Sequence, residues 1–283
     1  YEAGKYTTSG SNNIFLGCQT GMCNVDADNN IFLGNKAGYC SSDTSCSVAI
    51  GFYAAACRNS ANGIFIGRYA GYGCAGATGT NNVAIGNDAG RSGSTSNNGI
   101  YIGYSAGKNT TAGSYNNFFG YYAGCANTTG NCNVFIGKYA GQNSVDTGQS
   151  VYIGDQAGQC VRGSNNVYLG TMAGEGSSTA SNNTGGHNVA IGINAAKGIT
   201  SGSHNVSLGS YAGQCNSTGA CNFSAGIFAA KCRNSTNGVF IGRYAGMGCN
   251  GATGAGNIIL GNEAGKCSTT GANNVISGSY AAK

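Results

Sequence analysis

The chain has no proline and no tryptophan, and only 8% of its 283 residues are charged, against roughly 25% in a typical domain. Because proline and a Gly-X-Y period are both missing, a collagen triple helix is excluded. No apolar run approaches the ~20 residues that a membrane-spanning helix needs, so we expect no membrane insertion. The 14 basic and 9 acidic residues are scattered singly, and we therefore expect no nucleic-acid partner.

Glycine and cysteine are abundant instead, at 52 and 14 residues. Hydrophobic residues make up 41% of the chain, which is enough to bury a core and argues against disorder. No initiator methionine or signal peptide is visible, which indicates a mature chain or a fragment of a longer protein.

A short unit repeats through the whole chain. Stretches such as NNIFLG, NNVAIG and NGVFIG recur in sixteen copies, spaced mostly by 17 residues, with 16, 19 and 22 as variants. We number each unit from the last glycine of this stretch, which we call position zero. The zero glycines are Gly17, Gly34, Gly51, Gly67, Gly86, Gly103, Gly120, Gly137, Gly154, Gly170, Gly192, Gly209, Gly226, Gly242, Gly261 and Gly278.

Each unit reads as a short strand, a glycine corner and a polar loop. Positions −3 and −1 are usually Val, Ile or Leu, and this period of two predicts a strand. Position +3 is Ala in fifteen copies, and position −4 is Asn in eleven, which predicts a ladder of side-chain amides between coils. A unit this short cannot bury an apolar face alone, whereas stacked units can. We predict an all-β protein whose residues 1–283 form a single continuous parallel β-solenoid (β-roll) of about sixteen coils, stapled by disulfides.

The runs N-N-V-A-I-G and G-x-Y-A-G resemble the N-S-V-A-I-G repeats of YadA-like trimeric autotransporter heads and the repeats of tail-fibre-like surface proteins. The resemblance covers essentially the whole chain and implies a parallel β-roll on a cell or virion surface. Its motif is short, the unit here is longer, and the autotransporter heads are not cysteine-rich. The resemblance therefore does not by itself assign a trimer.

A longer repeat overlies the short one. CRNSANGIFIGRYAGYGCAGATG at 57–79 and CRNSTNGVFIGRYAGMGCNGATG at 232–254 differ at four of 23 positions and lie 175 residues apart. The offset equals ten units and makes residues 1–108 equivalent to residues 176–283. This pattern indicates duplication of a block that lengthens a rod.

Position −2 is aromatic in nine copies. If positions −3 and −1 face the core, position −2 faces outward and forms an apolar stripe typical of an interface; the alternative is that loops, glycans or the second sheet of the roll cover it. The stripe consists of Phe15, Phe32, Phe65, Tyr101, Phe118, Phe135, Tyr152, Tyr168 and Phe240.

Two pairing schemes compete for the cysteines. In the first, cysteines at +6 or +7 pair with the cysteine above or below them in the next coil, since coils about 4.8 Å apart are within disulfide range. In the second, a cysteine at the exit of one coil pairs with a cysteine at the entry of the next, and the two schemes compete for Cys40 and Cys215. We favour a combination of both: Cys40–Cys46, Cys125–Cys132 and Cys215–Cys221 from the second scheme and Cys57–Cys74 and Cys232–Cys249 from the first, with Cys18–Cys23 as a weaker pair and Cys160 and Cys267 free or linking chains.

No catalytic constellation is apparent, so we expect no enzyme and no cofactor. Missing C-x₂-C pairs and the presence of only two histidines disfavour a metal site. The sequons that we place in loops are Asn109, Asn127, Asn216 and Asn234. We expect a structural subunit of an extracellular fibre or surface appendage, assembling head to tail with copies of itself as a homopolymer. The alternative is a homotrimeric adhesin or tail-fibre shaft that binds a host surface or its glycans.

Overall fold

A computed structural model describes residues 1–42, 44–73, 77–177, 183–249, 252–268 and 270–282. These residues form strands, turns and loops, and none of them belongs to a helix. Accordingly, no helix in the described ranges has the length and apolar character needed to cross a membrane. The all-β prediction is confirmed.

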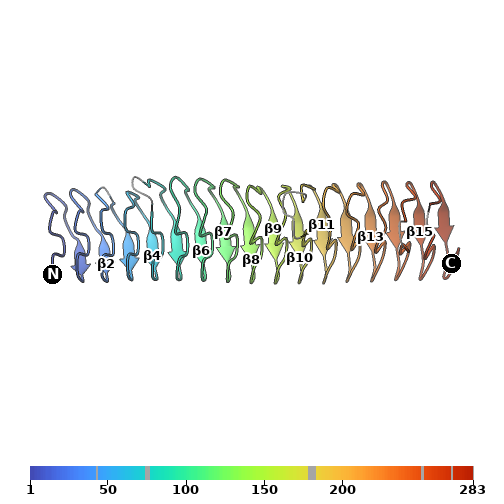
Figure 1. The fold of residues 1–283 in the computed structure, drawn as a ribbon, viewed down its shortest axis with the longest axis horizontal. Helices are drawn as coiled ribbons and strands as arrows, with labels where there is room; N and C mark the ends of the chain where they lie inside the picture. Colours follow the sequence, from blue (N-terminus) through green and yellow to red (C-terminus); the bar gives the residue numbers. More distant parts are fainter. Residues whose placement is uncertain (43, 74–76, 178–182, 250–251, 269, 283) are drawn as a thin grey trace. The chain divides into compact units, whose positions relative to one another are not determined.

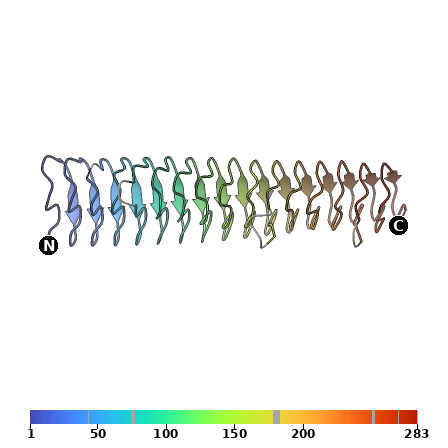
Figure 2. The same cartoon turned by 45° about the horizontal axis from the view of Figure 1, so that its top comes forward.

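Contacts divide the chain into two units, Tyr1–Lys138 and Tyr139–Lys283. Within each unit the coils follow one another side by side, with a three-residue strand in each coil (Figures 1 and 2). The strands of the first unit are β1 (Ile14–Leu16), β2 (Ile31–Leu33), β3 (Val48–Ile50), β4 (Ile64–Ile66), β5 (Val83–Ile85), β6 (Ile100–Ile102), β7 (Asn117–Phe119) and β8 (Val134–Ile136). Those of the second are β9 (Val151–Ile153), β10 (Val167–Leu169), β11 (Val189–Ile191), β12 (Val206–Leu208), β13 (Phe223–Ala225), β14 (Val239–Ile241), β15 (Ile258–Leu260) and β16 (Val275–Ser277).

The register of the strands never slips within a unit. Each strand pairs in parallel with the next, and residues at equivalent positions are paired, as Ile14 is with Ile31. Pairing is unchanged across the longest spacing of 22 residues, where Val167 faces Val189. Extra residues between strands therefore do not change the register, and longer connections add little entropic cost. The predicted parallel β-solenoid with a period of about 17 residues is confirmed.

The zero glycines form a column in which no other residue fits. Their φ angles run from 121° at Gly209 to 140° at Gly17, a backbone region that favours glycine. A Cβ atom at Gly51 would lie 2.6 Å from the carbonyl oxygen of Gly67 in the next coil. The predicted glycine corner is therefore confirmed.

The core contradicts our prediction for position −2. The middle residue of each strand from β2 to β15 is buried, while both flanking residues are half-buried or exposed. The aromatic stripe is thus an internal column, and the predicted interface at these positions is wrong. Phe15 is half-buried, and Phe32, Phe65, Tyr101, Phe118, Phe135, Tyr152, Tyr168 and Phe240 are buried.

The rings can point inward because each aromatic residue at position −2 lies opposite a glycine at position +4 of the same coil. Position +4 opposite the ring is glycine, and a Cβ there would run into the ring, as at Gly21, where it would lie 2.7 Å from an atom of Phe15. Rings of neighbouring coils stack, with centroids 4.8 Å apart for Phe118 and Phe135. Alanines at +3, such as Ala37, fill the remaining space. A single row of rings therefore forms the centre of the core.

The asparagine ladder at −4 is present as predicted. Asn205 donates from its main-chain N–H and its side-chain Nδ2 to Asn188 Oδ1, at 2.9 and 3.2 Å. Asn222 repeats both bonds to Asn205, at 3.0 Å each. Since these side chains are buried, the bonds satisfy polar groups that water cannot reach.

Two buried arginines occupy equivalent places 175 residues apart, Arg58 and Arg233. Arg58 donates from Nε to Gly71 O at 2.9 Å and from Nη1 to Gly79 O at 3.2 Å. Arg233 donates from Nε to Gly246 O at 2.7 Å. The main chain of Arg58 forms an isolated parallel β-bridge with Ala77, and that of Arg233 forms one with Ala252. The two equivalent sequences therefore adopt equivalent structures.

Candidate functional site

The exposed apolar surface lies on the outer face of the sheet, at positions −3 and −1. Residues of these columns are up to 74% exposed, at Val275, and none of the sixteen strands contains a charged residue. The exposed members are Ile14, Leu16, Ile31, Ile64, Ile136, Ile153, Ile191, Phe223, Ile241, Ile258 and Val275. We call this surface the aliphatic face.

A second ordered column, at position +2, was missed by our sequence analysis. Phe228 stacks between Tyr211 and Tyr244, with ring centroids 4.8 and 5.0 Å away. Lysine from position +5 lies over these rings, with Lys231 Nζ 4.8 Å from the centroid of Phe228. The recurrence of Tyr or Phe two residues after the glycine was a signal for this column. Its rings are half-buried and stacked on each other, so the column is held together by aromatic and cation–π contacts.

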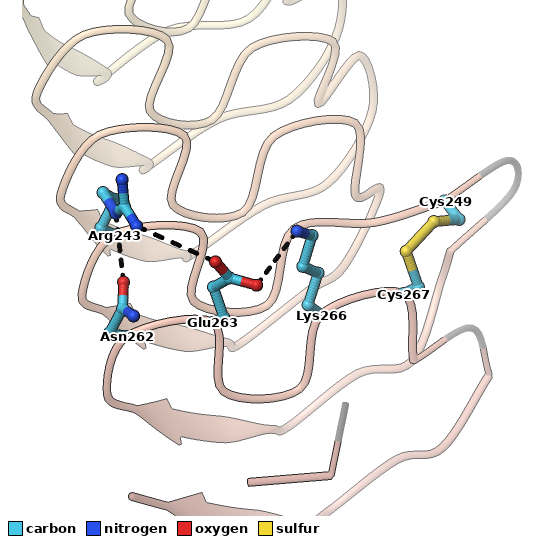
Figure 3. A network of polar contacts seen from close by, with 6 residues as sticks. All are labelled: Arg243, Cys249, Asn262, Glu263, Lys266 and Cys267. Carbon is cyan, nitrogen blue, oxygen red and sulfur yellow. Dashed lines mark hydrogen bonds and ion pairs between the residues drawn. A yellow bond between two sulfur atoms is a disulfide. The ribbon is translucent and has the colours of Figure 1, made fainter. Parts of the chain in front are cut away.

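The disulfide found among the described residues joins neighbouring coils, but it uses a different pair from those we favoured. Cys249 is bonded to Cys267 of the next coil, and their Cα atoms are 4.7 Å apart (Figure 3). The predicted Cys232–Cys249 bond is therefore wrong, as is the prediction that Cys267 is free or links chains. Beside this bond, Glu263 accepts from Lys266 Nζ at 3.1 Å and lies 3.9 Å from Arg243.

The predicted bonds across single loops are absent from the described residues. Cys23 Sγ instead lies 3.8 Å from Cys40 Sγ in the next coil, because equivalent positions stack directly. Cys57 is a free thiol, and its predicted partner Cys74 lies outside the described residues. Four favoured bonds are therefore not formed, and their cysteines are free thiols: Cys18–Cys23, Cys40–Cys46, Cys125–Cys132 and Cys215–Cys221.

Cys160 is a free thiol, but its surroundings do not suit a link between chains. Its residue is only 8% exposed, and its sulfur accepts a hydrogen bond from Asn143 Nδ2 at 3.5 Å. A thiol in this position packs as a small apolar group.

The structure separates the four candidate glycosylation sites into two pairs. Asn127 and Asn216 are 0% and 4% exposed, so neither can accept a glycan in the folded chain, and those two predictions are wrong. Their side chains turn inward because each follows the tight turn at +4. Asn109 and Asn234 are exposed and remain predicted acceptors.

The titratable groups offer little chemistry. His187 and His204 stack with ring centroids 4.8 Å apart, as one more column of equivalent residues. Within the described ranges, no cluster of three or more His, Cys, Asp or Glu side chains is placed to hold a metal ion. Burial raises the pKa of Cys23, and burial together with Cys232 raises the pKa of Cys215 to about 11, so neither thiol is activated as a nucleophile.

Comparison with known proteins adds no relative from which a site can be transferred. No protein-family model, no curated protein and no solved structure matches the chain.

Proposed function

We propose that the protein is a structural subunit of an extracellular fibre or surface appendage and assembles with copies of itself. The observation that carries this proposal is the unchanging register of the coils. Each coil presents the same row of main-chain donors and acceptors to both neighbours. A coil of another chain can therefore pair with it through the same main-chain hydrogen bonds that join coils within the chain. Such edge-to-edge pairing is what soluble proteins otherwise prevent.

The aliphatic face supports contact between copies side by side. Its columns repeat with the spacing of the coils, so a second copy is a partner whose side chains can interdigitate along the whole surface. The strands carry no charge to oppose that contact. One eight-strand unit offers about 400 Å² per partner, from a coil rise of ~4.8 Å and a strand of about 10 Å. Since a stable interface buries roughly 800 Å² per partner, association strengthens as more coils take part.

Electron microscopy of the native protein tests the proposal. Threads whose axial repeat is a multiple of the coil rise, one or two chains wide, are the expected result. Discrete rods of three chains that do not lengthen with concentration would instead favour the trimeric adhesin or shaft. Dispersed single chains at all concentrations would contradict self-assembly altogether.

A further inference from the structure

The +6 positions of neighbouring coils bring free thiols together, and the bonded pair joins Cys249 at +7 to Cys267 at +6 of the next coil. Cys23 Sγ and Cys40 Sγ are 3.8 Å apart, and no main-chain segment separates them. Cys40 is exposed and Cys23 is partly exposed, so a redox reagent can reach both sulfurs.

Four cysteines of this column, including both members of the pair Cys215 and Cys232, share one backbone conformation. Cys40, Cys215, Cys232 and Cys267 have φ angles between 55° and 62°. The N–H of Cys232 donates to Gln214 O at 2.6 Å, just as the N–H of Cys267 donates to Met247 O at 2.8 Å. Side chains therefore leave equivalent backbones in the same direction, one coil apart. Cys267 reaches a neighbouring coil from this position, since it is bonded to Cys249.

We propose that the stacked pairs Cys23–Cys40 and Cys215–Cys232 are further disulfide sites, which close one coil onto the next in each unit. Each pair spans 17 residues, the length of one coil. Because Cys249 is already bonded to Cys267, Cys232 is left to Cys215. The two bonds and the existing one fasten successive coils along the stack, where an unfastened coil can fray.

The oxidation proceeds by thiol–disulfide exchange with a low-molecular-weight disulfide. One cysteine thiolate attacks the donor disulfide, forms a mixed disulfide and releases one donor thiol. The second cysteine thiolate then attacks the protein sulfur of that mixed disulfide and expels the second donor thiol. Both cysteines lose their protons, and the two electrons reduce the donor disulfide to two thiols. The sulfurs must approach from 3.8 Å to the bonding distance of about 2.05 Å, which side-chain rotation accomplishes.

Peptide mapping of the full chain tests the proposal. The protein is equilibrated with reduced and oxidised glutathione in the presence of a chelator, quenched with acid, alkylated, digested and analysed by mass spectrometry. The Cys249–Cys267 bond reports in the same sample that conditions are oxidising. We expect linked peptides for Cys23–Cys40 and Cys215–Cys232. Alkylated Cys23 and Cys40 in a sample with the bonded reporter pair, or linkage of Cys40 to Cys46, would overturn the proposal.

Matched single variants separate the two pairing schemes. Cys46→Ser and Cys221→Ser should leave both proposed linkages intact, because those cysteines lie across the loop and not in the +6 column. Cys23→Ser should make Cys40 open to alkylation. Loss of the Cys23–Cys40 peptide in Cys46→Ser would contradict the proposal, and the mapping of the unaltered chain decides the matter even where a variant folds poorly.

Discussion

Arg58 donates from Nη2 to the carbonyl oxygen of Gly93 at 2.8 Å, so a single side chain reaches a residue 35 positions later in the sequence. Its equivalent, Arg233, reaches Ser268 Oγ at 2.8 Å over the same separation. Both guanidinium groups lie near a core ring, with Arg233 5.6 Å from the centroid of Phe240. Burial lowers the pKa of Arg233, yet the main-chain carbonyls around it compensate for the lost water. Each arginine thus ties together coils that share no strand pairing.

Replacing Arg233 with methionine should destabilise the second unit by about 2–4 kcal/mol, because the buried carbonyl of Gly246 and the half-buried Ser268 lose their donor. The shift of the denaturant midpoint, followed by circular dichroism, measures this loss. The matched control is Arg243→Met, whose side chain is 56% exposed and whose ion pair contributes at most about 1 kcal/mol. Equal losses of stability in the two variants would contradict the conclusion that Arg233 ties together coils that share no strand pairing.

The complementarity between positions −2 and +4 predicts a rescue. Phe118→Ala should cost about 3–5 kcal/mol, since it empties the centre of the core. Adding Gly124→Ala should recover part of that loss, because Ala49 and Ala55 already form such a pair in another coil, where Ala55 has a φ of 52°. Gly124→Ala alone should be destabilising, as its Cβ would collide with the ring of Phe118. Additive effects in the double variant would contradict this explanation.

This same complementarity explains where the sequence misled us. Period, strand position, glycine corners and asparagine ladder all follow from column-wise identity, and all are present in the structure. The buried face of the strand cannot be predicted in this way, because positions −3, −2 and −1 are all apolar and alternation alone does not show which of them point into the core. All nine copies with an aromatic −2 residue have glycine at +4, and alanine occurs there only opposite Ala49, Ala190, Ser224 and Ile276. Because no aromatic −2 residue lies opposite alanine, this pattern within the chain could have identified the inner face, and we did not use it. Cysteine connectivity had no comparable signal, since both schemes join neighbouring positions.

The asparagine ladder should be sensitive to loss of an amide. In Asn205→Leu the acceptor for Asn222 and the donor to Gly219 O both disappear, leaving buried groups unpaired. We expect a loss of about 2–4 kcal/mol in chemical denaturation, from two unsatisfied buried groups. Asn109→Leu serves as the control, because Asn109 is exposed and does not have a positive φ, so the change should alter stability by less than about 0.5 kcal/mol. A comparable loss in the control would argue against the ladder.

Alkaline pH should destabilise the first unit through Tyr101. Burial raises the pKa of Tyr101 to about 12, from an unfolded value of 10.0. The folded state therefore holds this proton more tightly. The stability that it contributes is complete below pH 10 and is lost as the pH rises towards 12, by about 3 kcal/mol in total. Denaturation midpoints across this range, with tyrosinate absorbance as a second signal, measure the effect.

Tyr101→Phe is the matched variant for that measurement. The buried hydroxyl of Tyr101 has no hydrogen-bond partner among the residues that the structure describes, and the neighbouring coil has Phe118 at the same position. The variant should be at least as stable at neutral pH and should show a smaller loss between pH 10 and 12. An unchanged alkaline slope would assign the effect to other buried tyrosines.

Charge on the aliphatic face should weaken association between copies. Ile153 and Ile241 are 39% and 43% exposed, and each occupies position −1 of its strand. Lysines at both positions should reduce association at least about tenfold, because an unpaired charge buried in a contact costs several kcal/mol. Sedimentation velocity over a concentration series measures this. Lysines at Ser201 and Thr218, which are exposed in loops, add the same charge and should leave association unchanged.

Stacking with a constant register also sets how the chain folds. Most hydrogen bonds between coils join residues 13 to 22 positions apart, wherever the coil lies in the chain. Each new coil therefore closes a loop of similar length, and the entropic cost of adding it does not increase with the number of coils already formed. Folding can spread by nearest-neighbour addition, as in other repeat proteins. Lengthening the chain by whole coils would then raise its stability without lengthening the search for native contacts.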